Sequence, residues 1–137
     1  MALVIDSSLT LAWIYLDELT PTTLRLSQSV SKTGAWVPSI WRLEIANSLY
    51  FSVRRRRIDR AFRDQAVEDL SRLAISVDTA TNEFAWTTTL ALSDRFSLTM
   101  YDACYLELAQ RRALPLATHD KDLRKAAKAL DIPLLGI

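Results

Sequence analysis

Short apolar runs alternate with longer segments of helical periodicity along the whole chain. The short runs, such as ALVI at residues 2–5, are continuous rather than alternating. A strand of this kind is buried on both faces, which is typical of a parallel sheet covered by helices on both sides. The predicted strands are residues 2–5, 35–37, 74–77, 114–118 and 132–137. The predicted helices are residues 8–18, 21–31, 38–54, 59–73, 79–94, 98–110 and 121–130.

Length and element order together predict one α/β domain over residues 1–137. The chain contains no internal repeat, low-complexity segment or linker. No stretch approaches the roughly 20 apolar residues that cross a bilayer, and Asp6 interrupts the apolar run at the N-terminus. The single cysteine, Cys104, excludes an internal disulfide and fits a reducing compartment. We therefore expect a cytoplasmic protein that does not contact a membrane.

Composition excludes two common classes of nucleotide-binding site. The chain has two glycines, whereas a dinucleotide fingerprint or a P-loop needs several for close backbone approach to phosphate. Its formal net charge of +1 provides no overall field that would attract nucleic acid. Any contact with nucleic acid must then come from local clusters of charge.

Two acidic residues follow predicted strands directly. Asp6 comes after residues 2–5, and Asp120 comes two residues after residues 114–118. Ligands of open parallel sheets bind beyond the carboxyl ends of the strands, so both side chains are expected at the same edge. Each of them could instead serve as the N-cap of the helix that follows it.

Two further acids lie on predicted helices. Glu44 has Ile40, Trp41 and Phe51 as neighbours on its helix surface, which is not an ordinary solvated face. Asp102 lies in the first turn of its helix, three positions after Thr99, a spacing that also matches helix capping.

The four acids together indicate a site for a divalent cation. Two like charges about 4 Å apart repel by about 4 kcal/mol at an effective dielectric constant near 20. Four such groups without a compensating Lys or Arg would have raised pKa values or bind a cation. Ligands that are all oxygen favour Mg²⁺ or Mn²⁺ over zinc. This arrangement is suited to cleavage of phosphodiester bonds.

Four motifs, IDSS, LEIANSL, LTMYDACYLELA and ATHDKDL, resemble the PIN domain in their order and spacing, and in particular the VapC-type toxins of toxin–antitoxin pairs. The resemblance implies a parallel five-stranded sheet flanked by helices on both faces and Mg²⁺- or Mn²⁺-dependent cleavage of RNA. It implies that the catalytic and metal-binding residues are Asp6, Glu44, Asp102 and Asp120.

The residues next to Asp120 leave the identity of the fourth acid undecided. Asp122 could take over part of the role of Asp120, and His119 stands where the motif has an apolar or small residue. Ser7, Asn47 and Thr118 are expected to hold waters or to orient the carboxylates.

An arginine cluster is the strongest local concentration of charge. It consists of Arg54, Arg55, Arg56 and Arg57, followed by Arg60. These cations could complement a helix dipole, bind RNA phosphates or pair with an acidic partner segment.

The resemblance also implies protein partners. They are a small antitoxin that inhibits the active site and a second copy in a homodimer. Trp13, Trp36, Trp41 and Trp86 are expected in the core or at a dimer interface, with Trp13 and Tyr15 candidates to line an antitoxin groove. The alternatives are a PIN-domain nuclease of RNA processing without an antitoxin, and a non-catalytic PIN-like binding module.

Overall fold

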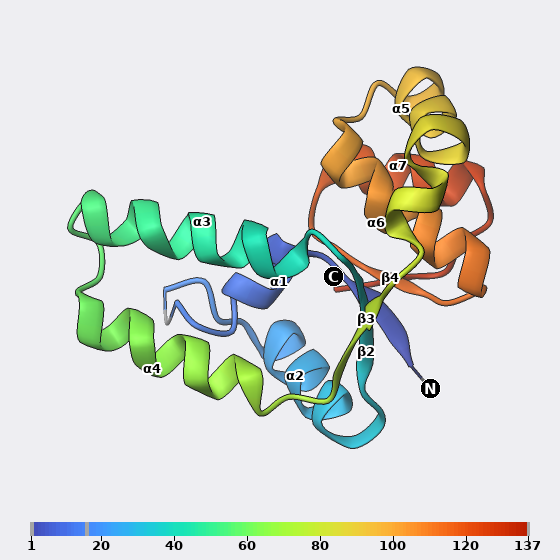
Figure 1. The fold of residues 1–137 in the computed structure, drawn as a ribbon. Helices are drawn as coiled ribbons and strands as arrows, with labels where there is room; N and C mark the ends of the chain where they lie inside the picture. The colour runs from blue at the N-terminus through green and yellow to red at the C-terminus, as the bar shows by residue number, and fades with distance from the viewer. Residues whose placement is uncertain (1, 16, 137) are drawn as a thin grey trace.

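The structure, a computed structural model, describes residues 2–15 and 17–136 (Figure 1). Within these residues the strands form one five-stranded, wholly parallel sheet in the order β3-β2-β1-β4-β5. This confirms the predicted α/β fold. The strands are β1 (Leu3–Ile5), β2 (Ala35–Pro38), β3 (Ile75–Asp78), β4 (Leu116–Ala117) and β5 (Leu134–Leu135).

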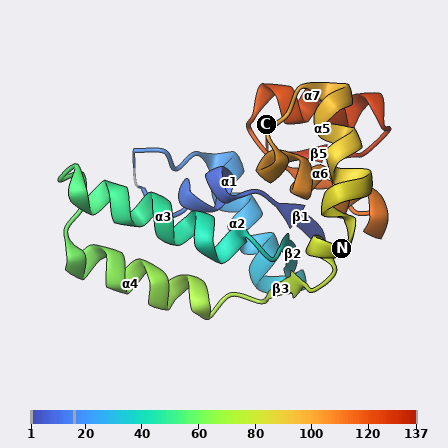
Figure 2. The same ribbon diagram turned by 45° about the horizontal axis from the view of Figure 1, so that its top comes forward.

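Helices cover both faces of the sheet, as Figures 1 and 2 show. From β1 the chain steps outward to β2 and β3, then returns to the other side of β1 for β4 and β5. Because such crossovers are right-handed, this reversal places the two sets of helices on opposite faces. The first set is α1 (Ser7–Leu11), α2 (Pro21–Thr33), α3 (Trp41–Arg54) and α4 (Arg60–Ser71). The second set is η1 (Thr81–Phe84), η2 (Ala85–Thr89), α5 (Leu90–Phe96), α6 (Met100–Arg112) and α7 (Lys121–Ala129).

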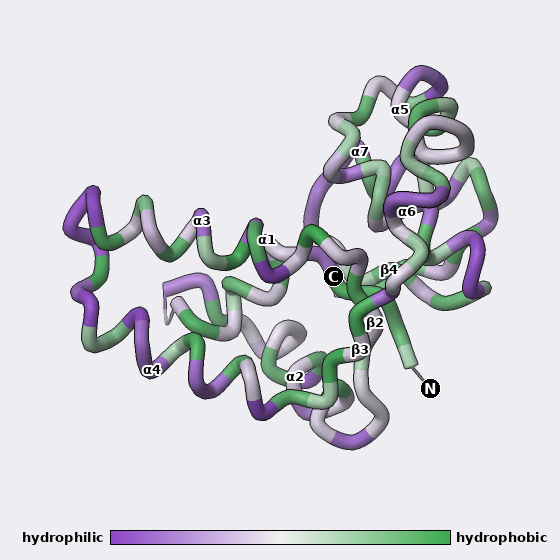
Figure 3. The backbone as a smooth tube through the Cα atoms, viewed as in Figure 1, coloured by the Kyte–Doolittle hydropathy of each residue, from purple (hydrophilic) through white to green (hydrophobic). Residues whose placement is uncertain are grey.

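The core lies on both sides of the central strand β1, every residue of which is buried. Leu9 and Leu49 belong to the buried cluster on the side of the first set of helices, and Leu106 and Leu123 to that of the second set. Figure 3 shows hydrophobic residues concentrated in the strands and hydrophilic residues at the turn between α3 and α4. In the part of the chain that is described, no helix combines the length and apolar character needed to cross a membrane.

Two predicted helices differ from the observed ones. The helix predicted over residues 8–18 ends at Leu11, and residues 12–14 continue as turns, while Leu16 lies outside the described residues. The hydroxyl of Tyr15 lies 2.7 Å from that of Ser52 in α3, a tertiary contact that periodicity does not reveal.

The helix predicted over residues 79–94 is divided into the 3₁₀ helix η1, the π-helix η2 and the α-helix α5. The β-branched run Thr87–Thr89 is a poor α-helix former because its side chains are restricted at χ1. The last two strands are also shorter than predicted, and Ile137 lies outside the described residues.

Candidate active site

The loops after β1 and β4 leave the sheet toward opposite faces. The register pairs Ile5 with Ala117, so Asp6 and Thr118 are neighbours just beyond the strand ends. Adjacent parallel strands whose loops diverge in this way form the usual ligand crevice of an open α/β sheet.

Asp6 occupies the centre of this crevice and is only 5% exposed. One of its oxygens caps α1 by accepting a 2.9 Å hydrogen bond from the backbone N–H of Leu9. The other accepts a 2.5 Å hydrogen bond from the hydroxyl of Thr118. The pKa of Asp6 is raised to about 6, mainly by burial and to a smaller extent by the charges of Asp102 and Asp120, while the two hydrogen bonds oppose the rise.

Asp120 begins α7 on the other side of the crevice. Its carboxylate accepts a hydrogen bond of 2.9 Å from the backbone N–H of Leu123, as a helix N-cap does. Its own backbone N–H donates to the hydroxyl of Thr118 at 3.0 Å. Thr118 therefore bridges Asp6 and Asp120, and capping does not remove Asp120 from the site.

Glu44 reaches the site from the first turn of α3. Its Oε1 accepts a hydrogen bond of 2.5 Å from the hydroxyl of Tyr105 in α6. Burial and the nearby charge of Asp102 raise the pKa of Glu44, and hydrogen bonds from Tyr105 and Ser7 oppose that rise.

Asp102 lies in the first turn of α6, whose N-cap is Thr99. The Thr99 hydroxyl accepts a 3.1 Å hydrogen bond from the backbone N–H of Asp102. Burial raises the pKa of the Asp102 carboxyl, and the charges of Asp120 and Asp122 add to the effect. Asp102 thus interacts with the acids on every side of the crevice, and Asp122 belongs to its surroundings.

The structure therefore brings all four predicted acids near one another, and none of the described residues provides them with a cationic partner. Over residues 2–15 and 17–136, no salt bridge to Lys, Arg or His involves any of these four carboxylates. Arg124 lies beside the crevice, but its guanidinium donates to the carbonyl oxygens of Thr118 and Leu135 at 2.6 and 3.0 Å. The excess negative charge remains available to an external cation.

The donor set suits a hard cation that keeps part of its water shell. No group of three or more Asp, Glu, His or Cys side chains among the described residues is arranged to hold a metal ion. Mg²⁺ commonly meets only one or two carboxylates directly and retains several waters. Oxygen donors with raised pKa values and no competing guanidinium fit an ion of that type.

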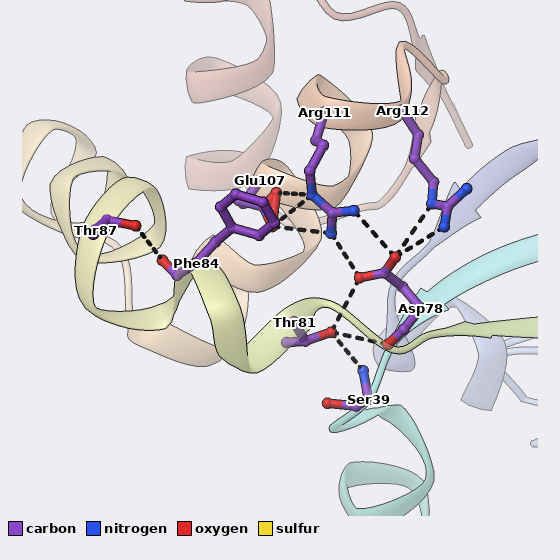
Figure 4. A network of polar contacts seen from close by, with 8 residues as sticks. All are labelled: Ser39, Asp78, Thr81, Phe84, Thr87, Glu107, Arg111 and Arg112. Carbon is purple, nitrogen blue, oxygen red and sulfur yellow. Dashed lines mark hydrogen bonds and ion pairs between the residues drawn. The ribbon is translucent and has the colours of Figure 1, made fainter.

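A second cluster of acids has the opposite character (Figure 4). Asp78 at the end of β3 is 1% exposed and forms ion pairs with Arg111 at 2.6 Å and Arg112 at 3.0 Å. Burial alone would raise the pKa of Asp78, but hydrogen bonds and charges from the two arginines hold it below its ordinary value. Glu107 pairs with Arg111 at 2.9 Å. Asp78 and Glu107 are thus neutralised by arginine, whereas no arginine among the described residues pairs with the acids of the crevice.

One member of the arginine cluster, Arg57, is engaged by neighbouring side chains. The guanidinium of Arg57 stacks over the ring of Tyr15 at 3.8 Å and pairs with Asp17 and Glu18. A groove of about 310 Å³ between α1 and α3 extends from Ser8 to Arg55 and Arg57. All five side chains predicted to bind RNA are exposed, and Arg54, Arg55, Arg56 and Arg60 form no salt bridge among the described residues.

Several predicted accessory residues take distinct positions. Thr118 hydrogen-bonds to the Asp6 carboxylate and Ser7 lies close enough to Glu44 to lower its pKa, whereas Asn47 is exposed in the neighbouring groove. The Nε2 atom of His119 lies 2.5 Å from the carbonyl oxygen of Gly136, toward the end of β5.

The tryptophans and tyrosines occupy different environments. Trp41 is buried in the core, whereas Trp86 is 89% exposed. Trp13 lines a depression of about 340 Å³ between α2 and α4, and Tyr15 lines the groove between α1 and α3. Tyr105, which was not among the residues predicted for the site, contributes its hydroxyl to Glu44. Its position one turn after Asp102 on α6 is the signal in the sequence that could have identified it.

Comparison with known proteins agrees with this geometry. The family model for the PIN domain matches residues 3–129. No curated protein sequence matches the chain.

Solved structures show the same fold over most of the chain. PAE2754 from Pyrobaculum aerophilum is 22% identical over 92% of this chain and 87% of its own, with a TM-score of 0.65. VapBC2 from Rickettsia felis, bound to a DNA fragment from its promoter, is 11% identical over 99% of this chain and 98% of its own, with a TM-score of 0.69. A toxin–antitoxin complex from Klebsiella pneumoniae is 17% identical over 88% of both chains, with a TM-score of 0.58. At these identities the likeness shows the fold alone.

Proposed function

The chain belongs to the PIN domain family, and on that premise we propose that it is a metal-dependent endoribonuclease that hydrolyses RNA phosphodiester bonds. The observation that carries the proposal is the set of four carboxylates at the crevice between β1 and β4, unpaired with any cation of the described residues. The proposed nuclease domain spans residues 1–137.

The cation in this proposal is Mg²⁺ or Mn²⁺. Asp6 and Asp102 would be its principal ligands, Glu44 would bind it directly or through water, and Asp120 or Asp122 would complete the set. When bound, the ion supplies positive charge at the scissile phosphate and lowers the pKa of a water molecule.

The protein's own groups would then orient the reactants. Thr118 holds Asp6 in one orientation, and Tyr105 holds Glu44, so the carboxylates are arranged before RNA arrives. In hydrolysis the oxygen of the attacking water forms a bond to phosphorus, while the bond from phosphorus to the leaving nucleotide oxygen breaks. A carboxylate of the cluster orients the water and accepts its proton.

The proposal extends to protein partners. A toxin–antitoxin complex shares this fold, which supports a small antitoxin that covers the crevice and blocks cleavage. The exposed side chains of Leu43, Trp86 and Tyr101 are large apolar surfaces of the kind that a partner, or the second copy of a homodimer, would cover. Light scattering on the isolated chain tests the homodimer.

Calorimetry with Mn²⁺ tests the proposed function, with cleavage of a total RNA pool measured in parallel. We expect the wild type to bind Mn²⁺ and to cleave RNA, and Asp102→Asn to lose both while remaining folded. Asp94→Asn, which changes an exposed acid on α5, is the matched control. Unchanged binding and cleavage in Asp102→Asn would mean that Asp102 only stabilises the start of α6. Binding without cleavage in the wild type would favour a PIN-like binding module.

A further inference from the structure

Tyr105 is a polar residue in an apolar position. It lies on the buried face of α6, is 1% exposed and belongs to the hydrophobic core cluster. Packing alone explains its ring but not its hydroxyl, because a phenylalanine would fill the same volume without a polar atom to satisfy.

The Tyr105 hydroxyl connects three elements around the crevice. It donates a hydrogen bond of 2.5 Å to Oε1 of Glu44, a residue 61 positions away on α3. The side chain of Ser7, at the start of α1, lies close enough to Tyr105 and Glu44 to lower the pKa of both groups. Helix α6 also carries Asp102 one turn earlier, so one helix supplies a carboxylate and the donor that holds a second carboxylate.

Glu44 does not need this donor merely to be solvated. Its side chain is partly exposed, and a glutamate on a helix has several rotatable bonds through which it can reach water. Here it lies instead where the charge of Asp102 repels it. A hydrogen bond to an ionised oxygen is stronger than a neutral one, so the Tyr105 hydroxyl offsets part of that repulsion.

We propose that Tyr105 is a positioning residue, whose hydroxyl holds the Glu44 carboxylate beside that of Asp102 so that the two can bind one cation. This inference rests on the proposed function, since it concerns how the site binds its metal ion. Outer partners of metal ligands typically change affinity or activity by about 10- to 100-fold when they are removed.

The test compares Tyr105→Phe with the wild type. Phenylalanine retains the ring in the core and removes only the hydroxyl, and circular dichroism checks that the variant is folded. Titration with Mn²⁺ followed by electron paramagnetic resonance is expected to show binding weakened about 10-fold or more. For RNA cleavage at saturating Mn²⁺, kcat should fall while KM stays unchanged, because Tyr105 does not contact RNA. Tyr105→Met, which also lacks the hydroxyl, replaces this variant if it does not fold.

Tyr15→Phe is the matched control. It also removes a tyrosine hydroxyl that has a partner on α3, Ser52 at 2.7 Å, but that pair includes none of the four acids. Its Mn²⁺ affinity is expected to equal that of the wild type.

A double-mutant cycle with Glu44→Gln separates positioning from a general effect on packing. If Tyr105 acts through Glu44, adding Tyr105→Phe to Glu44→Gln should weaken Mn²⁺ binding little further. Full additivity would overturn the proposal, as would wild-type affinity in Tyr105→Phe. A wild type that neither binds Mn²⁺ nor cleaves RNA would overturn the proposed function, and this inference with it.

Discussion

The hydroxyl of Thr118 donates a hydrogen bond of 2.5 Å to Oδ2 of Asp6, joining residues 112 positions apart in the chain. The bond exists because β1 and β4 are adjacent in the sheet and in register, although β4 is the fourth strand along the chain. It holds a buried carboxylate at the point where the loops of the sheet diverge. The ionised Asp6 carboxylate is therefore energetically unfavourable, and it lies in the crevice between β1 and β4.

Asp6→Asn should stabilise the protein at neutral pH in the absence of metal. The pKa of Asp6 is about 6 in the folded protein against an ordinary value of 3.8, so the folded state binds more protons between these pH values. The free energy of unfolding therefore falls as pH rises through this range, and the ionised group costs the fold about 3 kcal/mol at pH 7. Asparagine keeps the helix cap but forms a weaker hydrogen bond with Thr118, so we expect a net gain of about 1 to 2 kcal/mol.

Urea unfolding in the presence of EDTA measures this effect at pH 7 and at pH 4. The advantage of Asp6→Asn should disappear at the lower pH, where the carboxyl of the wild type is protonated. Asp94→Asn should show no such pH-dependent difference. Equal stability of Asp6→Asn and the wild type at pH 7 would contradict the burial of an ionised Asp6.

Mn²⁺ should stabilise the wild-type fold. A ligand that binds only the folded state adds about 2.7 kcal/mol at 100 times its Kd, which for a domain of this size raises Tm by about 5 to 10 °C. Differential scanning fluorimetry measures the shift, with a sodium salt of equal ionic strength as the control. EDTA should reverse the shift and abolish RNA cleavage, and Asp102→Asn should remove the shift. Cleavage that persists in EDTA would refute the role proposed for the cation.

The exposed members of the arginine cluster should contribute to RNA affinity. Changing Arg54, Arg55 and Arg56 to Ala should raise KM and leave kcat nearly unchanged, because these side chains lie at the far end of α3 from Glu44. The slope of log affinity against log salt should decrease by about 0.7 for each phosphate of single-stranded RNA that the variant no longer neutralises. Fluorescence anisotropy with a labelled RNA at several salt concentrations measures the slope. Arg25→Ala, which removes an exposed cation on α2, is the control. An unchanged slope in the triple variant would mean that the cluster does not bind RNA and only complements the dipole at the end of α3.

Asp78→Ala should destabilise the fold without changing the chemistry of the site. The change leaves Arg112 without its carboxylate partner and Arg111 with only Glu107. Loss of one partner from a buried ion pair costs about 3 to 5 kcal/mol, and partial exposure of the arginines reduces the expected cost to about 2 to 3 kcal/mol.

The pH dependence of this second effect has the opposite sign to that of Asp6. The pKa of Asp78 is lower in the folded protein than in the unfolded chain, so its contribution is present at neutral pH and is lost as pH falls through the folded value. Urea unfolding at pH 7 and pH 3 should therefore show a smaller cost of Asp78→Ala at the lower pH. Cleavage per folded molecule should match the wild type, and a large loss of kcat would instead connect this cluster to the site through α6.

The sheet and the positions of the acids along it could be predicted from the amino-acid sequence. Continuous apolar runs separated by helical segments are compatible with a parallel sheet and with few other folds, because each run must be buried on both faces. Once the strands are known, Asp6 and Asp120 must lie near the same edge of the sheet, since the carboxyl ends of parallel strands are on the same side. Glu44 and Asp102 stood out because an acid among apolar neighbours requires an explanation.

The hydrogen bonds that hold those acids could not be predicted in the same way. The hydrogen bonds from Thr118 to Asp6 and from Tyr105 to Glu44 join residues on different elements, and no local periodicity encodes them. The structure also decided which charges are neutralised. Asp78, at the end of β3, forms ion pairs with Arg111 and Arg112 in the last turn of α6. The crevice acids form no ion pair with an arginine among the described residues. Charges act over distance in space rather than along the chain, so the sequence could name the acids but not their partners.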